Sequence, residues 1–104
     1  MEKEQGKEYF YNRTMCPDVK EYVISTHARF EMERRGIVEA DIERVIKQPE
    51  QKFEARPGRC IYQSRIQCGN PSVEYLDRVI VDADRKPAVV VTVYRTSKVR
   101  KYWR

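Results

Sequence analysis

The chain has 104 residues, a length that fits one domain built around one hydrophobic core. Charged residues make up 36% of it and hydrophobic residues 40%, so it is too rich in core-forming side chains to be disordered throughout. No apolar run approaches the roughly 18 residues of a membrane helix, and residues 1–5 lack the pattern of a signal peptide. We therefore expect a cytoplasmic protein with no membrane partner.

The positive charge of the chain is concentrated at its C-terminal end. Fourteen of the 21 Lys and Arg residues and all 16 Asp and Glu residues precede residue 85, which gives that part a net charge of −2. The last twenty residues carry seven cationic side chains and no acidic one. A local excess of this kind predicts a local anionic partner more strongly than a high isoelectric point alone does.

Three cysteines are present, Cys16, Cys60 and Cys68. Their odd number and wide spacing do not resemble the disulfide framework of a small secreted domain, so free thiols are expected. A metal site made of Cys60, Cys68 and His27 is the alternative. The single His and the lack of a close Cys pair disfavour it, and we expect neither a metal nor another cofactor.

Residues 1–20 are polar and mixed, and are predicted to form a loose N-terminal arm before a single domain at residues 21–104. The arm has one apolar cluster, Tyr9 to Tyr11, which is either part of a frayed terminus or docks on the body or on a partner. Residues 21–24 follow as a short candidate edge strand.

Two short helices are predicted next. Ser25 and Thr26 are good N-cap residues for a helix over 27–35, and Gly36 supplies a left-handed stop. Apolar residues recur at helical spacing from Ile37 until Pro49 ends the second helix.

The period then changes to two, which is typical of strands. Strands are predicted at 51–55, 60–66, 75–82 and 89–94, joined by short turns. The last of these is the densest β-branched run and should be a central strand. Helices followed by consecutive strands favour an α+β fold, with two N-terminal helices packed on a four-stranded antiparallel sheet.

Several motifs together resemble a small prokaryotic family of uncharacterised domains, similar to the BrnT-like and RelE/ParE-like toxins. They are His27-Ala28-Arg29, Arg35-Gly36-Ile37, the helix at 41–46 followed by Pro49-Glu50, Pro57-Gly58-Arg59 and the closing stretch 91–98. The resemblance covers about residues 25–104. It implies a RelE-like fold and, by analogy of fold, cleavage of RNA.

Metal-independent RNA cleavage needs a general acid and base, and fixed cations for the phosphorane charge. His27, the only His, is the natural acid or base, although a helix-start His also serves as a cap or packing residue. Arg95 and Arg59 are candidate phosphate clamps, or else ordinary strand-end ion pairs.

Tyr94 either stacks a base and contacts the phosphate, or packs at the edge of the core. Strand alternation places Tyr94 and Arg95 on opposite faces of a regular strand, so one cleft would receive only one of them unless the strand is bulged.

The C-terminal residues mix cations with rings, a composition used to bind single-stranded RNA. The alternative is a solvated basic tail. Arg29 and Arg35 could extend an RNA surface along the first helix, although Glu31 and Glu33 lie at ion-pair spacing. The predicted RNA-binding residues are Arg29, Arg35, Lys98, Arg100, Lys101 and Trp103.

We therefore expect a metal-independent endoribonuclease of the toxin type, with His27, Arg95, Tyr94 and Arg59 as catalytic candidates. Its partners would be RNA or ribosome-bound RNA and an acidic antitoxin protein. The alternative is a non-catalytic RNA- or protein-binding module on the same fold.

Overall fold

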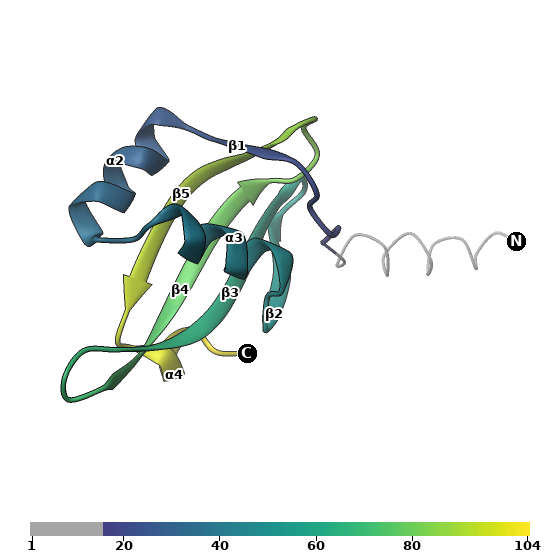
Figure 1. Ribbon diagram of the computed structural model, residues 1–104. Helices are drawn as coiled ribbons and strands as arrows, with labels where there is room; N and C mark the ends of the chain where they lie inside the picture. Colours follow the sequence, from purple (N-terminus) through teal and green to yellow (C-terminus); the bar gives the residue numbers. More distant parts are fainter. Residues whose placement is uncertain (1–15) are drawn as a thin grey trace, which may run out of the picture.

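A five-stranded sheet forms the centre of the computed structural model, which describes residues 16–104 (Figure 1). The elements in chain order are β1 (Tyr22–Ile24), α2 (Thr26–Arg35), α3 (Glu39–Lys47), β2 (Gln51–Arg56), β3 (Arg59–Cys68), β4 (Val73–Asp82), β5 (Ala88–Thr96) and α4 (Val99–Tyr102). The predicted α+β class, both helices and all four strands after Pro49 are confirmed. The aromatic cluster at Tyr9 to Tyr11 lies outside the described residues.

The sheet is mixed, which corrects the expected four-stranded antiparallel arrangement. Its strand order is β1-β5-β4-β3-β2, and the last four strands pair antiparallel. β1 adds to the far side of β5 as a parallel strand, with Tyr22 opposite Ala88 and Ile24 opposite Val90. Strand β5 is therefore flanked on both sides, as expected of a central strand.

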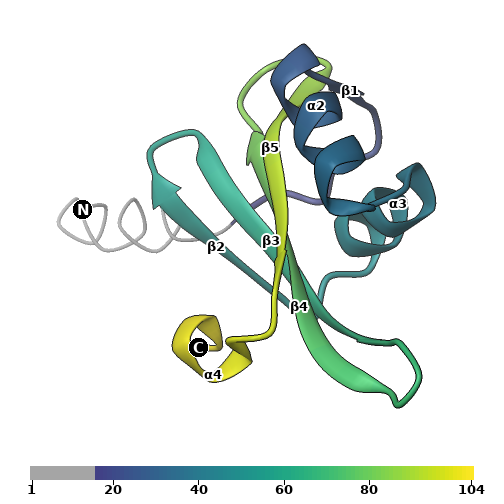
Figure 2. The same ribbon diagram turned by 90° about the vertical axis from the view of Figure 1, so that its left-hand side faces the viewer.

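The two faces of the sheet carry different helices. Helices α2 and α3 lie over one face, whereas the short α4 and the C-terminus lie against the other (Figure 2). We call the first the helix face and the second the α4 face. The main core fills the helix face: Ala28 and Met32 of α2 and Ile42 and Val45 of α3 are buried there.

Both helices begin and end as local chemistry requires. The Ser25 hydroxyl accepts a hydrogen bond from the Ala28 backbone N–H at 3.0 Å, and Gly36 ends α2 in the left-handed conformation with φ 70°. Val38 precedes α3 and has no side-chain acceptor, so Asp41 satisfies this end by accepting from the Val38 N–H at 3.1 Å.

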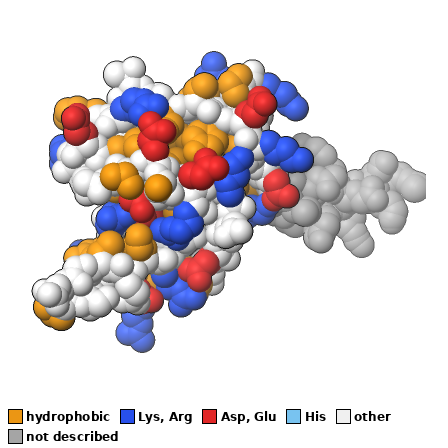
Figure 3. Space-filling view, in the orientation of Figure 1, with side chains coloured by type: hydrophobic (Ala, Val, Ile, Leu, Met, Phe, Trp, Pro, Cys, Tyr) orange, Lys and Arg blue, Asp and Glu red, His pale blue; other side chains and the backbone are white. Residues whose placement is uncertain are grey.

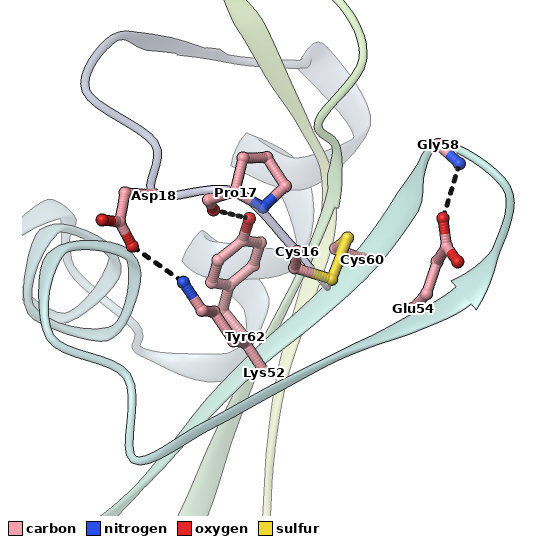
Figure 4. The surroundings of a disulfide bond; sticks show 8 residues. All are labelled: Cys16, Pro17, Asp18, Lys52, Glu54, Gly58, Cys60 and Tyr62. Carbon is pink, nitrogen blue, oxygen red and sulfur yellow. Dashed lines mark hydrogen bonds and ion pairs between the residues drawn. A yellow bond between two sulfur atoms is a disulfide. The ribbon is translucent and has the colours of Figure 1, made fainter. Parts of the chain in front are cut away.

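Residues 16–20 pack on the domain and are not part of a loose arm (Figure 4). Cys16 forms a disulfide with Cys60 of β3, which corrects the expectation of three free thiols and removes Cys60 from any metal site. The Tyr62 hydroxyl donates to the Pro17 carbonyl oxygen at 2.5 Å, and Lys52 pairs with Asp18 at 2.7 Å. Burial, and then the charge of Asp18, raise the pKa of Tyr62 to about 12.

Strand β5 contains a bulge at Val91. Val90 pairs with Val81 and Thr92 with Ile80, so Val91 has no partner on β4. The bulge shifts the expected alternation, because Val90 rather than Val91 is fully buried.

Candidate functional site

Four polar side chains form a row across the α4 face. Strand register places Gln51 opposite Gln63, and Gln63 opposite Arg78. Arg78 in turn lies opposite Tyr94. Opposite residues of paired strands share a face of the sheet, so these side chains meet. We call the four residues the polar ladder.

Hydrogen bonds run along the polar ladder without a break. Gln63 Nε2 donates to Gln51 Oε1 at 2.8 Å. Arg78 Nε donates to Gln63 Oε1 at 2.8 Å, and the Arg78 guanidinium also donates to the Tyr94 hydroxyl. All four strands of the antiparallel part of the sheet therefore contribute one member of a single network.

Arg78 is the unusual member because it is a buried cation without a counter-ion. Its exposed fraction is 6%, and within residues 16–104 no carboxylate forms an ion pair with it. The ring of Tyr102 lies 4.3 Å from its guanidinium carbon and that of Tyr94 lies 5.5 Å away. A buried charge is costly unless paired, so rings and neutral acceptors replace the usual carboxylate here.

The C-terminal segment, residues 98–104, completes the α4 face. Trp103 lies 4.3 Å below the Arg65 guanidinium, and the Arg104 guanidinium lies 4.0 Å above the Phe53 ring. Gln63 Nε2 donates to the Tyr102 carbonyl oxygen at 3.1 Å. The basic tail predicted from the sequence is therefore docked on the sheet, and its rings bracket cations of the strands.

The helix face contains a different cluster, in which charges are balanced. Arg95 Nε donates to Asp77 at 2.6 Å, and its NH2 group reaches Asp41 of α3 at 3.2 Å. Arg44 lies 3.5 Å from Asp77. We call these two arginines and two aspartates the charged quartet. The hydrogen bonds to Asp77 raise the pKa of Arg95 further above its ordinary value, so Arg95 acts only as a fixed charge.

Tyr94 and Arg95 point to opposite faces, as strand alternation predicts. Tyr94 packs edge-on against Tyr102 on the α4 face, with ring centres 6.1 Å apart. Arg95 lines a hollow of about 400 Å³ with Arg35, Cys68 and Tyr75. The two catalytic candidates therefore belong to separate sites.

The other catalytic candidates lie away from both. His27 is the exposed second residue of α2. Arg35 is at the other end of this helix, about 12 Å away, and its guanidinium carbon lies 5.9 Å from the centre of the Tyr94 ring. His27 is therefore far from Tyr94. Arg59 forms a two-bond ion pair with Asp82, at 2.7 and 3.2 Å. Asp82 lies five residues beyond Asp77 on β4, roughly 17 Å away.

The predicted RNA-binding residues divide between the two faces. On the helix face, Arg29 pairs with Glu39 at 2.8 Å, and Arg35 pairs with Glu31 at 2.9 Å. Figure 3 shows acidic and basic side chains intermixed over this face. The remaining four belong to the C-terminal segment: Lys98, Arg100, Lys101 and Trp103. The three cations among them form no ion pair with a carboxylate in the described part of the chain.

Sequence reasoning missed Gln51, Gln63 and Arg78. One signal was available, because Asp77 and Arg78 lie in the middle of β4 between apolar residues, and charges within an interior strand require partners. The partners themselves depend on strand register, which the sequence pattern does not specify.

Residues 16–104 contain neither a candidate membrane-spanning helix nor a candidate metal site. No helix there is both long enough and apolar enough to cross a membrane. In the same residues, no three His, Cys, Asp or Glu side chains are grouped so that they could hold a metal ion.

Fold and site together define a small α+β domain whose sheet presents a network of cations and rings on the face opposite its two main helices. A family described as a domain of unknown function, DUF4258, matches residues 24–95, and the chain belongs to this family. The match includes all four members of the polar ladder and ends before the C-terminal segment. Neither the curated proteins nor the solved structures contain a significant match.

Proposed function

We propose that this protein binds single-stranded RNA through the α4 face. The observation that carries the proposal is Arg78, a buried cation that is bracketed by rings and lacks a carboxylate partner. Proteins that bind single strands combine cations for the phosphates with rings on which bases stack. The C-terminal segment adds both, because Lys101 and Trp103 lie on it within two residues of each other.

The charge distribution supports this face over the other. Cations of the helix face are already engaged by carboxylates, as in the Arg29–Glu39 pair and the charged quartet. A phosphate approaching them would have to displace or approach those carboxylates, which costs Coulomb energy. No such competitor opposes a phosphate at Lys98, Arg100 or Lys101 within the described residues.

The test removes two positive charges from each face in turn and compares the effects on RNA binding. Binding of a fluorescent oligouridylate is measured by anisotropy at several salt concentrations. Replacing Arg100 and Lys101 by Gln should weaken binding and flatten the salt slope by about 0.7 for each lost phosphate contact. The matched control replaces Arg29 and Arg34 by Gln and should leave the slope unchanged. Equal slopes in the two double variants, or no binding by the unaltered protein, would refute the proposal.

Cleavage of the bound RNA is the second candidate function, in line with the resemblance to BrnT-like and RelE/ParE-like toxins. It is favoured by the contact between the Arg78 guanidinium and the Tyr94 hydroxyl, since a fixed cation beside a phenol can stabilise phosphorane charge. Such cleavage would spare DNA and leave a 2′,3′-cyclic phosphate, because the attacking group is the 2′-hydroxyl.

The separation of candidates makes this second function testable. If cleavage is centred on the polar ladder, Tyr94→Phe should abolish it and His27→Ala should retain it. If His27 is instead the general acid or base, His27→Ala should lower the cleavage rate by about 10²–10⁴-fold. Product ends and rates are read on a labelled RNA with excess chelator. An acidic antitoxin remains the protein partner that we propose for a toxin, and inhibition by such a protein would be measured in the same assay.

A further inference from the structure

Arg78 is closed off from any ligand in the structure. Its exposed fraction of 6% leaves no room for a phosphate, and the Tyr102 ring lies over the guanidinium at 4.3 Å. Leu76, two residues earlier and therefore on the same face, is fully buried as well. The group best suited to hold an anion on this face is thus beneath the C-terminal segment.

The C-terminal segment is attached by contacts between rings and cations and by a few hydrogen bonds, not by buried residues of its own helix. Helix α4 has four residues, none of them buried, and no side-chain cap at Lys98. A helix of this length has no stability of its own. Its polar anchors are the bond from Gln63 to the Tyr102 carbonyl and two bonds between Gln51 and Arg104, at 2.7 and 3.1 Å. Segments with few buried contacts open at a small fraction of the global unfolding free energy.

Charge makes opening easier still. The segment carries four cations and no acidic side chain, and it rests on a face that already contains Arg65 and Arg78. Glu50 offsets Arg65 through an ion pair at 3.0 Å, but no comparable partner among residues 16–104 offsets Arg78. Repulsion between like charges therefore opposes closure. A polyanion bound to the face would reverse the sign of that interaction.

We propose that Arg78 is a phosphodiester-binding residue and that residues 98–104 are its cover, which RNA displaces. This proposal rests on the proposed RNA binding and adds to it a specific anchor and a closed, RNA-free state. A ligand shifts an equilibrium only by its difference in affinity for the two states. Here the difference is the contact between a phosphate and Arg78, which exists only when the cover is lifted.

The first experiment loosens the cover without changing its charge. Tyr102→Ala removes the ring over Arg78, and the apparent affinity for oligouridylate should rise about three- to tenfold, because a larger fraction of the protein is competent to bind. If Tyr102 instead serves as a base-stacking platform, the same variant binds more weakly. Unchanged or weaker binding overturns the proposal that residues 98–104 cover Arg78.

The second experiment tests the anchor. Arg78→Met should flatten the salt slope by about 0.7, and adding Tyr102→Ala to it should give no gain in affinity. An unchanged slope in Arg78→Met, with normal binding by the unaltered protein, overturns the role of Arg78 and leaves the proposed function standing. No binding by the unaltered protein overturns the proposed function itself.

A chemical probe covers the case in which Arg78→Met does not fold. Phenylglyoxal modifies accessible guanidinium groups, and peptide mass spectrometry reports the extent at Arg78. Modification should be slow in the unaltered protein, faster in Tyr102→Ala, and blocked there by saturating oligouridylate. Equal rates in the two proteins, or modification that RNA does not slow, overturns the proposal. Arg34, which lies exposed on α2, is the internal reference.

Discussion

Arg95 and Arg78 lie on opposite faces of the sheet, and their charges are accommodated in opposite ways. On the helix face, Arg95 lies between Asp77 and Asp41, so positive charge is cancelled where it is buried. On the α4 face, Arg78 lies between the rings of Tyr94 and Tyr102, so its charge is accommodated but not cancelled. Asp77 and Arg78 are adjacent in sequence, and strand alternation alone sends one to each face. The difference fits the proposal that Arg78 keeps its charge for RNA, while Arg59 and Arg65 of the same face pair with carboxylates as Arg95 does.

The largest expected effect contrasts those two neighbours. Asp77→Asn keeps the shape of the side chain but leaves Arg95 with only Asp41, and Arg44 with no carboxylate partner among residues 16–104. Loss of one partner from a buried ion pair typically costs about 3–5 kcal/mol. Arg78→Met removes a charge that has no counter-ion, and should change the free energy of unfolding by less than about 1 kcal/mol. Urea unfolding at neutral pH measures both.

Equal destabilisation by Asp77→Asn and Arg78→Met would contradict this difference between Arg95 and Arg78. A larger loss in Arg78→Met would show that the rings and Gln63 hold the sheet together, and that the α4 face is as structural as the helix face. RNA binding measured on the folded fraction of each variant separates stability from affinity.

The second expected effect concerns the segment at residues 16–20, which supports the helix side of β3. Cys16→Ser removes a disulfide that spans 44 residues, and the unfolded chain then gains entropy worth about 2–4 kcal/mol. Cys68→Ser, at the free cysteine, is the matched control and should cost much less. Thermal unfolding with and without reductant checks this, since reductant should bring the unaltered protein to the level of Cys16→Ser.

RNA binding extends that test. Cys60 and Tyr62 belong to the helix side of β3, and the polar ladder lies on the other side. At temperatures where Cys16→Ser stays folded, its affinity for RNA should therefore equal that of the unaltered protein. The disulfide also bears on location: such bonds are rare in the cytosol, so the cytoplasmic expectation stays a prediction that the redox state of Cys16 in cells would test.

Local features of the fold were predictable from the sequence, and non-local ones were not. The cap at Ser25, the stop at Gly36 and the β2–β3 hairpin each depend on residues close in the chain, where propensity and turn chemistry operate. The pairing of β1 with β5 joins residues 66 apart, such as Tyr22 and Ala88, and no periodic pattern specifies it.

The candidate site shows the same division. Tyr94 and the basic C-terminal segment stood out by composition, and both lie on the α4 face. Gln51, Gln63 and Arg78 became candidates only through cross-strand register, which brings residues of four strands into one row. The pairing of Cys16 with Cys60 was missed for a related reason, because an odd number of cysteines says nothing about which two approach each other.

The smallest expected effect concerns Arg59, whose ion pair with Asp82 lies on the α4 face at the far end of β4. Hydrogen bonds from Arg59 hold the pKa of Asp82 below its ordinary value of 3.8. Because the folded state binds this proton less readily than the unfolded chain, the pair stabilises the fold above about pH 4 and loses that contribution as the pH falls through the lowered pKa. Arg59→Gln should therefore cost about 1 kcal/mol at pH 7, the upper range for a partly exposed pair, and progressively less as the pH falls below about 4. Urea unfolding across this pH range measures the difference, with Lys86→Gln, at an exposed cation that does not shift the pKa of Asp82, as control. A cost independent of pH would mean that Arg59 contributes by packing, and RNA affinity that falls with Arg59→Gln would extend the binding surface along the α4 face to the far end of β4.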